Sequence, residues 1–483
     1  MSSYHPPKPE EPVTPREFFQ IIQFGTGKDF DRHAFQQYRE RLGLRCDEIV
    51  RQTRDYFTKI VGIRPAELSE IAPNGTFPTS ESYAALQEQI RTSICANISF
   101  LQTYAEEHRE AGLRRMGTEA NNYLNRLRVY YFPGEESLET KSEVEICNDA
   151  AGLVMLAFND DVDKRVKFEA ARKLLLMQYV GEIRNYNNPD EDSNEALHYI
   201  LGLFNERILR LPEGARMGHT TPRYLVSRHA PNTYETVHTD ILDKKPTHIS
   251  KGGLTQVTHL PSRKTTVIGT NGKKREIFFG LDPREKGEES RLTKALRYGS
   301  HIGERDVDRN GLKLVFEKRE DWEDFFAMFQ AEIKCEIGEA LRERLKKEDI
   351  SETERVTMTT RLDNLDDCIQ IMDVKDSLAG NGFEGGSLAS SKEFKVLKFR
   401  LNVTRANGQQ HKYEFQIFLP DGYADAKYRK GVSWEEYRAD RFFKEGVDKL
   451  LFPEKHYGEL DRKAAHDRVM QRAHENLWPT KPH

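Results

Sequence analysis

Cysteine, long apolar runs and an excess of charge of one sign are all scarce in this chain. The five cysteines are scattered over 483 residues without a C-x-x-C pair, which argues against a zinc cluster and a disulfide framework and favours a reducing compartment. No apolar run approaches the roughly 18 residues that a membrane span needs. The N-terminus lacks the apolar core of a signal peptide. We therefore expect a cytoplasmic protein that does not enter a membrane.

The charges of the chain are nearly balanced, because 74 Lys and Arg residues stand against 78 Asp and Glu residues, a formal net charge of -4. Without a positive excess we expect no bulk nucleic-acid binding, although a local basic site is allowed. A charged fraction of 31% and a mean hydropathy of -0.74 indicate a very polar surface. The length predicts roughly two to four domains.

Residues 14–211 have the pattern of a helical domain. Thr14 can cap the first helix, and apolar residues recur at helical spacing, for example at Leu86, Ile90 and Ile94. Strand signals are nearly absent from this stretch and it carries no catalytic motif. We therefore predict that residues 14–211 form a regulatory or sensing domain.

The pattern changes after residue 211, where turn-rich and β-branched sequence begins. Asn271-Gly272 and Asn407-Gly408 each lie between two strand-like stretches, which is typical of β-hairpins. The predicted fold class is α+β, with an all-α N-terminal domain followed by a mixed β-sheet domain with flanking helices. The expected organisation is a disordered lead-in at 1–13, the helical domain at 14–211, a linker or loop at 212–240, the sheet domain at 241–455 and a helical tail at 456–483.

A cluster of cations precedes one of the predicted strands. Arg284, Lys286, Ser290 and Lys294 form an R-x-K-x3-S-x3-K pattern. Ser290 and Lys294 would share one face of a helix, with the other two residues at or just before its start. Three cations and a hydroxyl suit the phosphate oxygens of a polyphosphate. The alternative is a charged helix start exposed to solvent.

Two carboxylates accompany this cluster. Asp308 lies just before an apolar strand, Leu312 to Phe316, and Glu414 lies on the polar face of a later strand, together with Gln416. If the two strands are neighbours, Asp308 and Glu414 could converge on one magnesium ion, which takes one or two protein carboxylates and completes its shell with phosphates and water. The alternative for Glu414 is an ordinary solvated strand residue.

The order of these motifs resembles the RelA/SpoT-type nucleotide pyrophosphokinase domain. In that family R-x-K-x3-S-x3-K is followed by D-x-x-G-x-[RK] and then by E-x-Q-I. Here the three motifs are REKGEESRLTK, DRNGLK and EFQI, and the resemblance covers roughly residues 245–445. It implies a nucleotidyltransferase-like mixed sheet that uses Mg²⁺ to move pyrophosphate from ATP to the 3′-hydroxyl of a guanine nucleotide.

The resemblance also implies roles for individual residues. The donor site for ATP would be made of Arg284, Lys286, Ser290 and Lys294. The catalytic metal ligands would be Asp308 and Glu414, with Lys313 and Gln416 as further substrate contacts. Lys313 stands where the family usually has arginine, which keeps the charge but loses the planar fork.

The chain departs from the family at the acceptor site. The family has a G-Y-x-S-x-H-like segment whose tyrosine stacks on the acceptor base, whereas this chain has NGFEGGSLASSKEFK. Phe383 would replace the tyrosine, no histidine follows, and Ser391 and Lys395 lie nearer to the strand.

The function predicted from the sequence is therefore transfer of pyrophosphate from ATP to a nucleotide, with the acceptor left open between guanine and adenine nucleotides. One alternative is a toxin-like enzyme that modifies a tRNA 3′ end. Another is a catalytically lapsed module that binds a nucleotide or a protein partner. A last alternative is an interaction protein in which the order of the motifs is coincidental.

Overall fold

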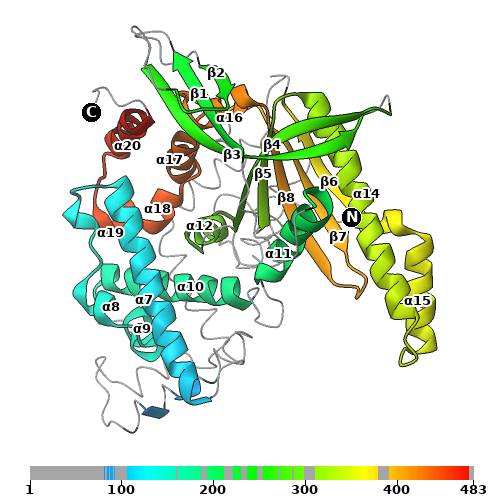
Figure 1. Cartoon of the computed structure of the whole chain (residues 1–483). Helices are drawn as coiled ribbons and strands as arrows, with labels where there is room; N and C mark the ends of the chain where they lie inside the picture. The colour runs from blue at the N-terminus through cyan, green and yellow to red at the C-terminus, as the bar shows by residue number, and fades with distance from the viewer. Residues whose placement is uncertain are drawn as a thin grey trace, which may run out of the picture.

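The protein forms a mixed β-sheet with helices on both faces and a separate group of helices beside it (Figure 1). The computed structural model describes residues 106–158, 162–185, 193–210, 221–229, 237–246, 254–269, 272–285, 288–298, 310–378 and 391–477, with positions 81, 84, 85, 88–90 and 92. The predicted α+β class is confirmed. The helix predicted to start at Thr14 and the lead-in lie outside the described residues.

The described part of the N-terminal half is helical, as the apolar spacing predicts. Its elements are α7 (Glu106–Tyr131), η2 (Glu136–Leu138), α8 (Ser142–Ile146), α9 (Ala150–Phe158), α10 (Lys164–Asn185), α11 (Ser193–Leu203) and η3 (Phe204–Ile208).

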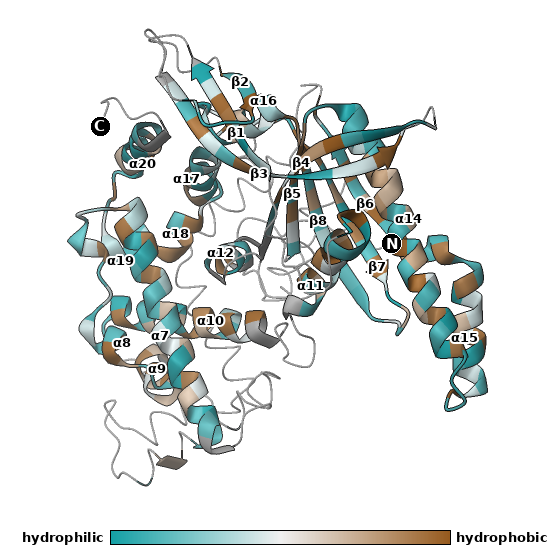
Figure 2. Ribbon diagram, viewed as in Figure 1, coloured by the Kyte–Doolittle hydropathy of each residue, from teal (hydrophilic) through white to brown (hydrophobic). Residues whose placement is uncertain are grey.

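Eight strands form one sheet in the order β2-β1-β3-β4-β5-β8-β7-β6. Apolar and polar residues alternate along several strands (Figure 2), which is the period expected when each face of a sheet has its own environment. The strands are β1 (Thr221–His229), β2 (His238–Leu242), β3 (Leu254–Ile268), β4 (Lys274–Glu285), β5 (Asn310–Phe316), β6 (Ile369–Asp376), β7 (Leu397–Thr404) and β8 (Gln410–Phe418).

Both predicted hairpins are confirmed. β3 and β4 pair in antiparallel fashion around Gly272, and β7 and β8 pair around Gly408. The two glycines have φ angles of 73° and 88°, a left-handed conformation that glycine adopts without a steric penalty. β5 and β8, which are far apart in the sequence, are parallel neighbours at the centre of the sheet.

Helices of the second half cover the sheet and extend beyond it. They are α12 (Glu288–Tyr298), α14 (Arg319–Leu345), α15 (Glu352–Asp363), η4 (Leu365–Cys368), α16 (Pro420–Tyr428), α17 (Trp434–Lys444), α18 (Val447–Leu451), α19 (Glu454–Tyr457) and α20 (Arg462–Leu477). The aromatic stripe of α14 is buried against the sheet through Trp322, Phe325 and Phe329.

The linker predicted at 212–240 is wrong, because β1 begins at Thr221 and pairs with both β2 and β3. Leu225, Val226 and Ser227 at its centre are all buried. Three consecutive buried residues give no period-2 alternation, so the strand has no amphipathic signal in the sequence. The sheet domain therefore starts before residue 241.

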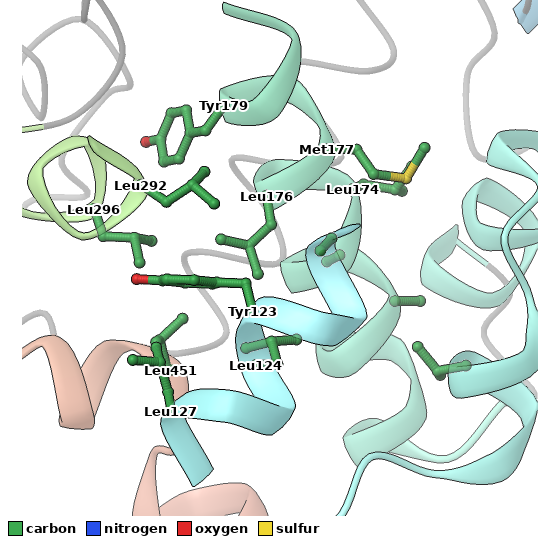
Figure 3. Close-up of a cluster of buried hydrophobic side chains, with 14 of the residues drawn as sticks. Tyr123, Leu124, Leu127, Leu174, Leu176, Met177, Tyr179, Leu292, Leu296 and Leu451 are labelled. Atoms are coloured by element: carbon green, nitrogen blue, oxygen red, sulfur yellow. The ribbon is translucent and has the colours of Figure 1, made fainter. Parts of the chain in front are cut away.

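The buried cores do not divide at residue 211 either. One core joins α7 and α10 to Leu292 and Leu296 of α12 and to residues of α17, α18 and α20. In Figure 3 the Tyr123 ring of α7 lies among Leu292, Leu296 and Leu451, and its hydroxyl is 2.9 Å from Oγ1 of Thr293. The N-terminal helices therefore share their interior with helices of the second half.

The other core joins α11 and η3 to the sheet. Ile200 and Phe204 are completely buried in the same apolar cluster as the central strands and α14. The Tyr413 hydroxyl on β8 donates to the carbonyl of Ala196 at 2.7 Å, and Nε2 of Gln409 donates to Oε2 of Glu195 at 3.0 Å. The end of the predicted helical domain is thus part of the sheet domain.

The start of β7 is held by a close contact with α16. A Cβ at Gly422 would lie 2.7 Å from the carbonyl oxygen of Lys395, a backbone atom that cannot move away alone. We expect Gly422→Ala to lower the free energy of unfolding by about 1–3 kcal/mol, the usual cost of overpacking. Denaturant melts should show this loss. Gly202→Ala in α11, where an added Cβ meets nothing within 4 Å, should be neutral or stabilising, and an equal loss in both variants would contradict the contact.

Candidate functional site

One face of the central sheet is polar where the other is apolar. The strand register places residues of β4, β5, β8 and β7 in two adjacent rows across this face. The first row holds Arg284, Gly311, Glu414 and Arg400, and the second holds Asp282, Lys313, Gln416 and Lys398. We call Asp282, Lys313, Lys398, Arg400, Glu414 and Gln416 the polar face. The intervening residues of the same strands, such as Leu312, Leu314 and Phe415, point into the opposite core.

Glu414 is the most enclosed carboxylate of the polar face, with 7% of the residue exposed. Nζ of Lys398 lies 2.6 Å from its Oε2, and Nε2 of Gln416 donates to its Oε1 at 2.5 Å. Glu414 is therefore not the ordinary solvated strand residue that was the alternative. A buried carboxylate is costly unless it is paired and hydrogen-bonded, and here both oxygens have protein donors.

Lys313 is buried beneath an aromatic ring. Its Nζ lies 3.2 Å from the centroid of the Trp434 ring at the start of α17, and only 4% of the residue is exposed. Phe418 and Tyr423 hold the indole by edge-to-face contacts, with ring centroids 6.2 and 5.8 Å away. An ammonium over an indole face is stabilised by the ring quadrupole, which offsets part of the cost of burying Lys313.

The predicted donor segment spans a strand end and a helix. Arg284 lies near the end of β4, opposite Gly311 in the register. Ser290 and Lys294 lie on α12, as predicted, and are half-buried. The buried face of this helix, Leu292 and Leu296, packs into the core shared with α7 and α10. Lys286 lies outside the described residues.

Two of the predicted acceptor-side residues, Lys395 and Ser391, lie just before β7. Nζ of Lys395 is 3.0 Å from Oδ2 of Asp421 and 3.9 Å from Oδ2 of Asp425, so Lys395 anchors the start of β7 to α16. Burial raises the pKa of the Asp425 carboxyl, although nearby cations oppose the shift. Ser391 accepts a hydrogen bond from the backbone N–H of Glu393 at 3.3 Å. Phe383 lies outside the described residues.

The described part of the polar face holds a carboxylate that suits a magnesium ion, but no complete metal site. The adjacency of strands on which the two-carboxylate prediction depends is confirmed, because Glu414 lies opposite Gly311 in the parallel pair β5–β8. Glu414 offers carboxylate oxygens, the protein ligand that Mg²⁺ usually takes before it completes its shell with phosphates and water. Asp308 lies outside the described residues, among which no three His, Cys, Asp or Glu side chains come close enough to bind a metal. Binding of one metal ion by both Asp308 and Glu414 therefore stays a prediction.

The sequence-based selection missed Lys398, Arg400, Asp282 and Trp434. Lys398 and Arg400 could have been found, because counting outward from the Asn407-Gly408 turn places them opposite Gln416 and Glu414. No local signal connects Trp434 to Lys313, since the contact depends on how α17 packs.

Comparison of the chain with protein-family models, with curated proteins and with solved structures finds no match. None of the helices in the described part of the chain has the length and apolar character that crossing a membrane requires. The functional argument therefore depends on the geometry of the polar face.

Proposed function

We propose that the polar face belongs to a magnesium-dependent site that transfers pyrophosphate from ATP to the hydroxyl of a nucleotide. The observation that carries the proposal is the parallel register of β5 and β8. It brings the strand that follows Asp308 beside Glu414, on a face that also holds Lys313, Lys398 and Arg400. The order of motifs that resembles the RelA/SpoT-type domain supports the same function, and a mixed sheet is consistent with it.

The chain would act mainly by positioning and by neutralising charge. Magnesium, when bound, would supply neutralisation of the phosphate oxygens next to the carboxylates. Nζ of Lys313 lies against the Trp434 ring, and this contact would place its charge before the substrate arrives. Fixed cations that face developing negative charge stabilise a transition state without reorganising. Arg284 and Lys286 are proposed to hold the ATP phosphates.

A second candidate function is that of a lapsed module that binds a nucleotide without turning it over. The ion pair between Lys398 and Glu414 favours it, because a carboxylate committed to a protein cation would not hold a metal. The two candidates share a nucleotide site and differ in whether product is released.

The test is incubation of the full chain with γ-³²P-ATP, Mg²⁺ and each of GDP, GTP, ADP, ATP and tRNA, with chromatographic separation of the products. Pyrophosphate transfer produces AMP together with an acceptor that carries the label. Magnesium-dependent ATP binding without AMP supports the lapsed module. Absence of both ATP binding and AMP would contradict both candidates and favour an interaction protein.

We expect Arg284→Ala and Lys286→Ala each to weaken ATP binding or slow transfer. The loss should correspond to about 2–3 kcal/mol, which is typical of a charge-assisted contact to phosphate. Titration calorimetry with a non-hydrolysable ATP analogue measures the binding part. Arg207→Ala serves as a control, because Arg207 pairs with Glu339 on α14, on the opposite side of the sheet. If ATP affinity and rate are unchanged in both donor-site variants, this segment is only a charged helix start that is exposed to solvent.

A further inference from the structure

The carboxylate that the proposed function assigns to the metal is already engaged by a lysine. The Glu414 side chain is 9% exposed, and that of Lys398, on the neighbouring strand, is 33% exposed. Lys398 lies opposite Gln416 in the register, so it reaches Glu414 along the diagonal of the β7–β8 pair. Arg400 lies directly opposite Glu414, but it forms an ion pair with Asp373 of β6. Within the described part of the chain, Lys398 is thus a cation that neutralises Glu414.

A divalent cation at Glu414 would stand next to the Lys398 ammonium. Two like charges at such a short distance repel each other. Lys313 adds further positive charge to the same face, whereas the charge of Arg400 is offset by Asp373. A free cation therefore meets an unfavourable potential at Glu414. A complex of the cation with a polyphosphate does not, because the phosphate oxygens compensate the charges of Lys398 and Lys313.

We propose that Lys398 is a positioning residue that competes with the divalent cation for Glu414, so that the cation binds only together with a polyphosphate. This inference rests on the proposed function and adds an order of binding to it. The greater exposure and the flexible stem of Lys398 allow its ammonium to leave Glu414 and reach a phosphate oxygen. Metal and nucleotide then each increase the affinity for the other, since binding linkage is reciprocal.

The inference is tested by titrating the full chain with Mn²⁺ as a substitute for Mg²⁺ and following the electron paramagnetic resonance signal of free Mn²⁺. The titration is carried out with and without a non-hydrolysable ATP analogue. For the wild-type protein we expect at least about tenfold tighter Mn²⁺ binding with the analogue than without it. For Lys398→Met, which keeps an apolar stem and removes the charge, we expect Mn²⁺ binding without the analogue to tighten about tenfold.

The chain offers a matched control in the same sheet. Nζ of Lys264 on β3 lies 2.7 Å from Oε1 of Glu276 on β4, and the register makes this pair diagonal as well. The two side chains are 46% and 61% exposed, so the control differs in burial and lies away from the polar face. Lys264→Met should leave Mn²⁺ binding unchanged. The double variant Lys398→Met, Glu414→Gln should lose the tighter Mn²⁺ binding of Lys398→Met. This loss would show that the ion binds at Glu414.

The outcomes separate this inference from the proposed function. Equally tight Mn²⁺ binding to the wild-type protein and to Lys398→Met without the analogue would overturn the competition. Absence of Mn²⁺ binding in every protein, even with the analogue, would contradict the metal site. It would therefore also contradict the proposed function and the competition. If Lys398→Met unfolds below the assay temperature, Lys398→Gln gives the deciding measurement. It keeps a donor to Glu414 without the charge, and a failure to tighten Mn²⁺ binding there would also reject the role of Lys398.

Discussion

Glu414→Gln is expected to abolish turnover while the protein stays folded. Glutamine has nearly the same shape as glutamate but is a poor ligand for Mg²⁺. Loss of a metal ligand should lower the rate of pyrophosphate transfer by at least about a thousandfold, or about 4 kcal/mol. Asp308→Asn should have the same effect if the two carboxylates share the ion. The rate of AMP formation from labelled ATP is the measurement.

The control for this prediction is Glu276→Gln. Glu276 also pairs with a strand lysine but lies outside the polar face, so its neutralisation should leave the rate within about twofold of wild type. Thermal melts of both variants should stay close to that of the wild-type protein, since Lys398 is partly exposed and can turn to water. A Glu414→Gln variant that keeps the wild-type rate would refute the role of Glu414 in catalysis.

A fragment of residues 216–483 is expected to be insoluble or to melt without cooperativity. The domain bounds predicted from the sequence, with the helical domain ending at residue 211, would instead allow such a fragment to fold by itself. The fragment would expose Leu292, Leu296 and Leu451 and would lack Ile200 and Phe204 from the core under the sheet. Exposure of each such side chain costs about 1.5–3 kcal/mol. The summed cost of exposing several such side chains is comparable to the free energy of unfolding of a typical domain, about 5–15 kcal/mol.

The comparison for this fragment is residues 81–483, which retains every described helix and strand. Yields of soluble protein and calorimetric melts of the two fragments decide the matter. A monomeric fragment 216–483 that melts cooperatively and binds ATP with Mg²⁺ would show that the helical half is separable after all. Failure of that fragment alone would show that the N-terminal helices are a structural wall of the protein.

The sequence by itself determined the local elements of the fold. The spacing of apolar residues predicted the helices of the described N-terminal half, and the Asn-Gly pairs predicted both hairpins. These features depend on neighbours within a few residues, which a single sequence contains. The alternation around Glu414 also placed its side chain opposite Phe415. β1 was missed because its consecutive buried residues have no period.

Only the tertiary structure decided which surfaces meet. An apolar stripe shows that a face is buried but not against what, because the hydrophobic effect has no direction. The stripes of α7 and α10 therefore gave no sign that α12 and α20 complete their core. The same reason applies to the site. The parallel pairing of β5 with β8, the cover of Trp434 over Lys313 and the ion pair of Lys398 with Glu414 join residues distant in sequence or depend on register. Such contacts are fixed when the whole chain packs, since no local preference encodes them.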